Sequence, residues 1–145
     1  METTTILSKN IRPAIPQYDW SDKTILVVED IELNYLYIRE LLLPTGAIIL
    51  RADNGKIGVE HCKNNSNIDM VLMDLLMPVM NGYEATKQIK AFKKSMPIIA
   101  QTAYALASDR RMAMDAGCDD FIAKPIGRDE LLKKMDALFQ VSNTV

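Results

Sequence analysis

The sequence of 145 residues holds only one histidine and two cysteines, too few for a typical metal-thiolate site. It also lacks the marks of membrane and nucleic-acid-binding proteins. Cys62 and Cys118 have neither metal-ligand spacing nor a disulfide framework around them, which favours a reducing, cytoplasmic setting. No apolar stretch approaches the roughly 20 residues of a membrane-spanning helix, and we find no signal peptide. A net charge of -2 lacks the basic excess of a sequence-independent nucleic-acid binder. We therefore expect one globular domain without direct nucleic-acid or membrane contact.

Short apolar runs alternate with helical patterns from Lys23 onward. Most of the runs are too continuous for half-exposed strands and are typical of a parallel sheet covered on both faces. Between them, apolar residues recur at helical spacing, as in Ala85, Ile89 and Phe92. We predict five β–α units, an α/β fold with right-handed crossovers. The predicted strands span residues 25–28, 47–50, 70–73, 98–100 and 121–123.

Residues 1–22 differ from the rest of the chain. Pro13 and Pro16 interrupt them and no period is sustained, which indicates an N-terminal arm or linker. Tyr18 and Trp20 either pack on the domain edge or are remnants of a connection to an upstream domain. We expect the domain itself to span 23–140, followed by a short tail at 141–145.

Polar residues end four of the predicted strands. Glu29 and Asp30 end the first, Asp74 the third, Thr102 the fourth and Lys124 the fifth. Ligands of such sheets bind at the carboxyl ends of the strands, near the switch point of the topology. These side chains are therefore candidates for one shared site.

Three carboxylates in a small space repel one another unless a cation neutralises them. Oxygen ligands without histidine or cysteine favour Mg²⁺ over Zn²⁺, and Lys124 adds a further positive charge. Such a site can hold a phosphoryl group, with Thr102 as a hydroxyl donor and one carboxylate as nucleophile. The sequence therefore predicts magnesium-dependent phosphoryl transfer to an aspartate.

The motifs around these residues resemble the receiver domain of two-component response regulators. The resemblance covers about residues 23–140 and implies a flavodoxin-like, doubly wound (βα)5 fold with strand order 2-1-3-4-5. Residues 74–82 match the family pattern Asp-x-x-Met-Pro-x-Met-Asn/Asp-Gly throughout. The matching segments are ILVVED (25–30), VLMDLLMPVMNG (71–82), IIAQTA (98–103) and DDFIAKP (119–125).

The resemblance implies a role for each site residue. Asp74 would accept the phosphoryl group, and Thr102 and Lys124 would contact its oxygens. Asp30 and Asp74 would bind Mg²⁺ with the backbone carbonyl of Leu76. The remaining implied residues are Glu29, which would hold the metal through water, Pro125, which would follow a cis peptide bond, and Phe121, which would be a switch aromatic working with Thr102. Phe121 as an ordinary core residue stays an open alternative.

Two positions depart from the commonest family pattern. Glu29 replaces a more frequent aspartate, and Phe121 replaces a common tyrosine, so a switch would act through packing alone. Leu76 and Tyr104 lie two residues beyond Asp74 and Thr102, at positions that border the route of the hydrolytic water in this family. We expect them to hinder that water and to prolong the life of the acyl phosphate.

The resemblance implies phosphotransfer partners: a histidine kinase phosphohistidine domain or a histidine phosphotransfer protein. The first helix and the loops around Asp74 would dock them, while the fourth helix, fifth strand and fifth helix form the family's signalling face, in some members a homodimer face. We favour the receiver of a hybrid sensor histidine kinase, cytoplasmic in either case, over a stand-alone response regulator. We expect no enzymatic activity beyond the domain's own phosphorylation and dephosphorylation.

Three other readings fit the sequence less well. A haloacid-dehalogenase-like phosphatase would carry a second aspartate where Leu76 stands. A flavin-binding module would have a loop rich in serine, threonine and glycine after the first strand, where this chain has Glu29 and Asp30. A scaffold receiver that is not phosphorylated would have lost Asp74, Lys124 or a member of the acidic pair.

Overall fold

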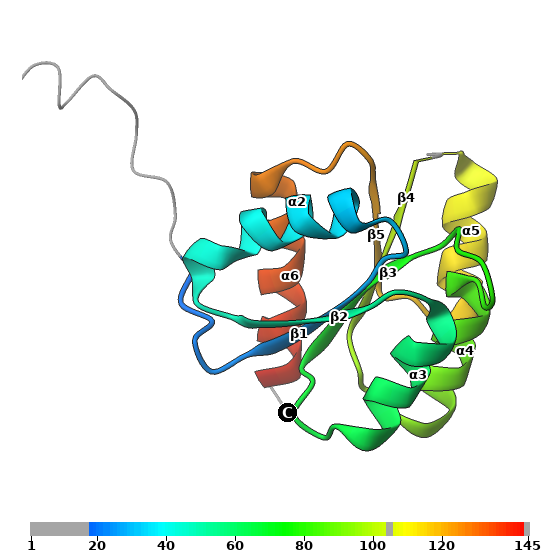
Figure 1. Cartoon of the computed structure of the whole chain (residues 1–145), viewed down its shortest axis with the longest axis horizontal. Coiled ribbons are helices and arrows are strands. Elements are labelled where there is room, and N and C mark those ends of the chain that lie inside the picture. Colours follow the sequence, from blue (N-terminus) through cyan, green and yellow to red (C-terminus); the bar gives the residue numbers. More distant parts are fainter. Residues whose placement is uncertain (1–17, 104–105, 144–145) are drawn as a thin grey trace, which may run out of the picture.

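The computed structural model describes residues 18–103 and 106–143, with side chains described to residue 141. Within this part of the chain, five parallel strands form one sheet in the order β2-β1-β3-β4-β5 (Figure 1). This is the flavodoxin-like order expected from the sequence, and the α/β prediction is confirmed. The strands are β1 (Thr24–Val28), β2 (Ile48–Ala52), β3 (Met70–Asp74), β4 (Ile98–Thr102) and β5 (Asp120–Ala123). The helices are α2 (Glu32–Leu42), the short 3-10 helix η1 (Leu43–Thr45), α3 (Gly55–Asn64), α4 (Gly82–Phe92), α5 (Ala107–Ala116) and α6 (Arg128–Asn143).

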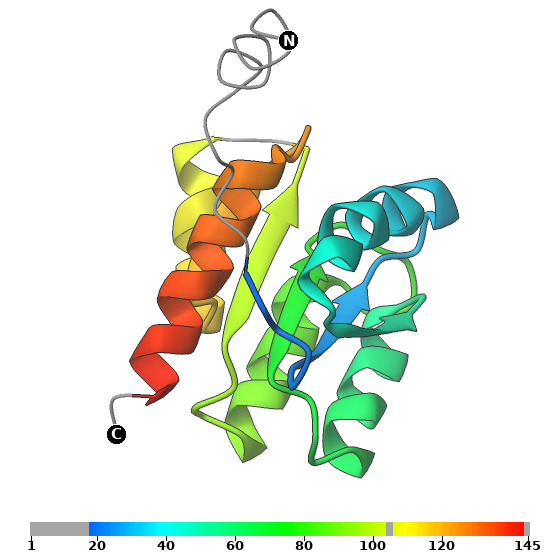
Figure 2. The ribbon, with the colours of Figure 1, turned by 90° about the vertical axis from the view of Figure 1, so that its left-hand side faces the viewer.

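Helices cover both faces of the sheet, with α2 and α6 on one side and α3, α4 and α5 on the other (Figure 2). Successive side chains of a strand point to opposite faces. In β1, Val28 joins the core under α3 and α4, while Val27 joins the core under α2 and α6. The same alternation places Leu72 of β3 and Ile99 of β4 on the α2–α6 side.

Local signals in the sequence fix several helix ends. The side chains of Asn54 and Asn81 accept hydrogen bonds from the backbone of Ile57 and Glu84 and so begin α3 and α4. Gly117 ends α5 with a φ of 113°, a conformation that favours glycine. The ends of α3, α4 and α5 are therefore marked by residue types that favour these positions.

The segment before β1 is part of the core. Trp20 is only 4% exposed. Its ring lies 5.1 Å from that of Tyr18 and 5.1 Å from that of Phe139 on α6 in an edge-on contact. Its backbone N–H donates to the carbonyl of Thr45. Of the two readings of Tyr18 and Trp20, the structure supports packing at the edge of the domain.

No helix among the described residues combines the length and the apolar character that crossing a membrane requires.

Candidate functional site

The carboxyl ends of β1 and β3 bring the three predicted acidic residues together. Glu29 and Asp30 follow β1, and Asp74 is the last residue of β3. Because Val28 pairs with Met73 in the parallel register, both strands end at the same height. Oxygen atoms of Glu29, Asp30 and Asp74 all lie within 4.8 Å of one another. The sequence prediction of a carboxylate cluster at this edge is therefore met by the geometry.

Lys124, just after β5, reaches across the sheet to this cluster. Its Nζ lies 3.0 Å from Oε1 of the fully buried Glu29 and 3.6 Å from Oδ1 of Asp74. The other Glu29 oxygen accepts a hydrogen bond of 3.1 Å from the backbone N–H of Ile31. The Lys124–Pro125 peptide bond is cis, as the sequence resemblance implied. The longer Glu29 side chain therefore engages the lysine directly.

The electrostatics of Asp74 follow from this crowding. Burial raises the pKa of its carboxyl to about 7, and the Glu29 charge adds to that rise. The ammonium group of Lys124 and the backbone N–H of Leu76 act in the opposite direction and lower the pKa. The site therefore holds more negative charge than its one lysine balances.

The donor set fits a hard divalent cation. It consists of carboxylate oxygens at the edge of a sheet, the ligand type that Mg²⁺ prefers. The Oδ1 atom of Asp30 is buried without a hydrogen-bond partner among the described residues, and such an atom calls for a ligand. A cation held by Asp30 and Asp74 would give that oxygen a partner and relieve the repulsion that raises the pKa of Asp74.

Thr102 and Phe121 occupy the neighbouring strands. Thr102 ends β4 and is buried, and its carbonyl accepts a 2.7 Å hydrogen bond from the N–H of Lys124. Phe121 of β5 is buried in the core under α3, α4 and α5. The Phe121 ring therefore points into the core in this conformation. Leu76 is exposed beside Asp74, while Tyr104 lies outside the described residues.

Two residues near the site were not singled out from the sequence. Arg51, the fourth residue of β2, donates to the backbone carbonyls of Glu29 and Asp30. Gln101, directly before Thr102, is 1% exposed, and neither its amide nitrogen nor its oxygen has a partner among the described residues. The sequence did mark Gln101, because it is the one polar residue in the otherwise apolar run 98–101. The contact of Arg51 depends on the residue-by-residue register of β2 against β1, which the sequence does not give.

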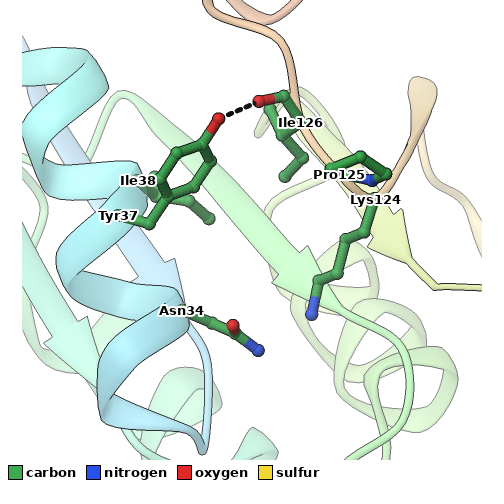
Figure 3. A pocket seen from close by; sticks show the side chains of 6 residues that line it. All are labelled: Asn34, Tyr37, Ile38, Lys124, Pro125 and Ile126. Atoms are coloured by element: carbon green, nitrogen blue, oxygen red, sulfur yellow. Dashed lines mark hydrogen bonds between the residues drawn. The ribbon is translucent and has the colours of Figure 1, made fainter.

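A pocket of about 460 Å³ opens beside the carboxylate cluster, between α2 and the segment after β5 (Figure 3). Figure 3 shows the Lys124 side chain at one wall and Asn34 of α2 opposite. The Tyr37 hydroxyl donates a 2.5 Å hydrogen bond to the carbonyl of Ile126, which ties α2 to that segment. The lining residues are Asn34, Tyr37, Ile38, Lys124, Pro125 and Ile126.

Known proteins share this architecture and sequence. The model of the response regulator receiver domain family matches residues 25–136. The two-component response regulator ORR41 of Oryza sativa subsp. japonica is 36% identical over 110 residues, which cover 74% of this chain and 87% of that protein. Other curated relatives are longer proteins, of which the chain spans between 6% and 53%.

Two solved structures are similar in sequence and in fold. One is the receiver domain of sensor histidine kinase PA1611 from Pseudomonas aeruginosa PAO1, with a magnesium ion coordinated in its active site cleft. It is 36% identical with a TM-score of 0.74, over 80% of this chain and 96% of that one. The other is the receiver domain of Ssk1 from Saccharomyces cerevisiae in complex with the histidine phosphotransfer protein Ypd1. It is 30% identical with a TM-score of 0.71, over 84% of this chain and 88% of that one.

The family match spans most of the folded chain, and its strand order agrees with the structure. This chain therefore belongs to the response regulator receiver family, the receiver domains of two-component and phosphorelay signal transduction.

Proposed function

We propose that Asp74 is the phosphoacceptor of this receiver domain and that it takes its phosphoryl group from a phosphohistidine. The observation that supports this most is the convergence on Asp74 of one ammonium group and two further carboxylates. A carboxylate in this setting can act as a nucleophile, because the ammonium group can neutralise the negative charge of the incoming phosphoryl group. Neighbouring acidic side chains without a lysine would only repel the incoming phosphate.

The transfer needs one bond to form and one to break. An Asp74 carboxylate oxygen attacks phosphorus, the new O–P bond replaces the P–N bond, and the imidazole nitrogen leaves with that electron pair. Lys124 stays protonated and moves from Glu29 toward the phosphoryl oxygens. Thr102 offers its hydroxyl to another of these oxygens. Positioning and charge stabilisation of this kind carry most of the catalysis in phosphoryl transfer.

The proposed cation is Mg²⁺, held by Asp30, Asp74 and the backbone carbonyl of Leu76, with Glu29 acting through water. When bound, it would neutralise the carboxylates and the charge on the transferred group. The magnesium seen in the PA1611 receiver supports this choice. The 3.0 Å pairing of Glu29 with Lys124 gives Glu29 a second role, holding the lysine until the phosphoryl group draws it away.

Thr102 and Phe121 form the proposed switch. When Thr102 moves toward a phosphoryl group, it leaves space beside β5, and Phe121 adjusts its packing there. Because Phe121 has no hydroxyl that could form a hydrogen bond, the movement of Thr102 would change only the packing of its ring. The exposed Leu76 supports a slow loss of the phosphoryl group, since an apolar side chain beside Asp74 hinders water. We propose no activity beyond this phosphorylation and dephosphorylation.

The docking face for the phosphodonor is α2 with the loops around Asp74. Large apolar side chains are exposed there: Leu33, Leu36 and Tyr37 on α2, and Val79 after β3. Exposed apolar residues around a charged centre are typical of protein interaction sites. The donor is a histidine kinase phosphohistidine domain or a histidine phosphotransfer protein, and the Ypd1 complex of the Ssk1 receiver supports the second kind.

The signalling face of α5, β5 and α6 is a second proposed interface, including a homodimer interface. Asp119 and Asp120 are already paired there with Lys90 and Lys134. The side chains of Arg110 and Arg111 on α5 are exposed, so their charges are available to a partner. We propose the cytoplasmic part of a hybrid sensor kinase as the setting, with a stand-alone regulator as the alternative. The hybrid setting is supported by the similarity to the PA1611 sensor kinase receiver, and the alternative by that to ORR41.

Incubation with acetyl phosphate and Mg²⁺, followed by intact mass measurement, tests the function. We expect a gain of one phosphoryl group that disappears when EDTA is added or when Asp74 is changed to Asn. Asp69→Asn, a substitution at the opposite end of β3, is the control and should be phosphorylated like the native chain. Equal phosphorylation of the Asp74→Asn variant would refute the assignment.

A further inference from the structure

Arg51 contacts the backbone of the acidic loop that follows β1. Its Nε and Nη2 atoms each lie 3.3 Å from the carbonyl oxygen of Glu29, and Nη2 lies 3.2 Å from that of Asp30. The guanidinium group thus binds the main chain of both residues rather than their carboxylates. Within the described part of the chain, Arg51 takes part in no recorded ion pair with an acidic side chain.

The contact fixes the loop from a rigid element. β2 pairs with β1 up to Val28 and Ala52, and the next N–H along, that of Glu29, donates to the Ala52 carbonyl at 2.9 Å. Arg51 and Ala52 together therefore hold the carbonyl and the N–H of Glu29. The Arg51 guanidinium carbon also lies 5.2 Å from the centre of the Tyr35 ring on α2, so a cation–π contact restrains the side chain itself.

Besides Arg51, the Glu29 carboxylate itself is held by Lys124 and by the N–H of Ile31. Ile31, at the start of α2, provides no side-chain cap for the helix, and its own N–H donates to the Glu29 carboxylate. Asp30 has a buried oxygen without a partner among the described residues. The two carboxylates at the cation site thus owe much of their placement to the backbone that carries them.

We propose that Arg51 is a positioning residue for the cation site: by clamping the Glu29 and Asp30 carbonyls to β2, it sets where their carboxylates stand. The inference rests on the proposed function, because it concerns the Mg²⁺ of that site. Groups that orient metal ligands without touching the metal commonly change metal affinity by about 10- to 100-fold when removed. Arg51 has the geometry of such a group.

Charge and geometry predict opposite results for the loss of Arg51. If the arginine acted only through its positive charge, its removal would leave the carboxylates more attractive to a cation and Mg²⁺ would bind more tightly. If it positions the loop, removal lets the carboxylates spread and Mg²⁺ binds more weakly. The sign of the change therefore separates the two.

Three variants of the full chain test the inference. Arg51→Met keeps an aliphatic side chain but has no hydrogen-bond donors. Arg51→Lys keeps the positive charge but loses the planar guanidinium group that contacts both carbonyls. Arg39→Met removes one positive charge from the exposed side of α2 and is the charge-matched control. The Kd for Mg²⁺ is measured by isothermal titration calorimetry, well below the unfolding temperature of each variant.

We expect Arg51→Met to raise the Kd by about tenfold, Arg51→Lys to lie between it and the native chain, and Arg39→Met to leave it unchanged. Amide hydrogen exchange, measured in EDTA, should be faster at Glu29 and Ile31 in Arg51→Met. Unchanged or tighter Mg²⁺ binding by Arg51→Met, with a native chain that binds Mg²⁺, overturns the positioning role and leaves the proposed function standing. A native chain that binds no Mg²⁺ overturns both.

Discussion

At the scale of single residues, the site is a balance of charges that the fold forces together. Asp74 is buried beside Glu29, and Lys124 is the one ammonium group recorded within reach of both carboxylates among the described residues. Like charges this close disfavour ionisation of both groups unless a cation is supplied. The proposed attack of Asp74 on phosphorus therefore calls for further positive charge at the site, which the proposed Mg²⁺ would supply.

The raised pKa of Asp74 predicts a pH dependence of stability. In EDTA, the folded chain keeps the Asp74 proton up to about pH 7, whereas the unfolded chain releases it near 3.8. Between these values the folded state binds more protons, so its stability falls as the pH rises. Asp74→Asn removes this loss and should be more stable than the native chain at about pH 8.

Urea denaturation at several pH values measures the difference. The gap between the Asp74→Asn and native chains should narrow steadily as the pH is lowered from about 7 to 5, and it should close only near the unfolded pKa of 3.8. A gap that stays constant from about pH 5 to pH 8 would show that the Asp74 carboxyl does not titrate in this window.

Gln101 is a second residue whose environment predicts an effect. Its amide is buried with neither atom paired among the described residues, a condition that costs about 1–3 kcal/mol. Leucine has a similar size and no polar atoms to satisfy. We expect Gln101→Leu to raise the free energy of unfolding by about 1 kcal/mol in urea denaturation, while Gln140→Leu on the exposed side of α6 should not. A loss of stability in Gln101→Leu would mean that the amide does have a partner in solution.

The identities of the site residues could be predicted from the sequence because each one ends an apolar run. Glu29, Asp30, Asp74, Thr102 and Lys124 all lie at the strand ends where they were expected. Their pairing could not be predicted. That Lys124 engages Glu29 at 3.0 Å and Asp74 at 3.6 Å depends on side-chain conformations set by packing across three strands.

At the scale of elements, the loop between β3 and α4 is shaped by Gly82. A Cβ atom at this position would lie 2.2 Å from the carbonyl oxygen of Asp74 and 2.8 Å from the Cα of Leu75. Backbone atoms at the end of a central strand cannot move aside without displacing the site. The first turn of α4 thus approaches Asp74 closely because residue 82 has no side chain.

Gly82→Ala should therefore both destabilise the domain and disturb the site. We expect a loss of about 1–3 kcal/mol in the free energy of unfolding, the range for inserting atoms into a packed region, and slower phosphorylation by acetyl phosphate. Gly127→Ala is the matched control, because nothing lies within 4 Å of a Cβ built there. Equal effects of the two substitutions would contradict the close approach of α4 to Asp74.

The strand bounds show where sequence patterns reach their limit. The central strands β1 and β3 were predicted to within one residue, since both are buried on each face. The edge strand β2 runs from Ile48 to Ala52 rather than over 47–50. Its half-exposed pattern includes the charged Arg51, and no apolar run marks its end. Because the sequence does not mark where β2 ends, it also does not predict the contact of Arg51 with the acidic loop.

At the scale of the whole molecule, the chain before β1 is fastened to the last helix. Trp20 packs between Tyr18 and Phe139, and Lys23 lies over the Phe139 ring at 5.2 Å. These contacts join the start of the domain to α6, far along the sequence. The sequence left the packing of Tyr18 and Trp20 open, because a tertiary contact with α6 leaves no local pattern.

Trp20→Ala should cost about 3–5 kcal/mol in the free energy of unfolding, as expected for the loss of a buried tryptophan. Trp20→Phe should cost less, since it keeps an aromatic ring against Phe139. Thermal or urea denaturation checks both variants. If Trp20→Ala unfolds at the same urea concentration as the native chain, residues 18–22 are not part of the folded domain.

The central claim is that the phosphoryl group is carried by Asp74 and by no other side chain. Borohydride reduction of an aspartyl phosphate leaves homoserine in place of the aspartate, and peptide mass spectrometry then locates it. After treatment of the full chain with acetyl phosphate and Mg²⁺, we predict homoserine at residue 74 alone. Homoserine at Asp30 or another position, or none in a chain that has gained the phosphoryl mass, would contradict the account.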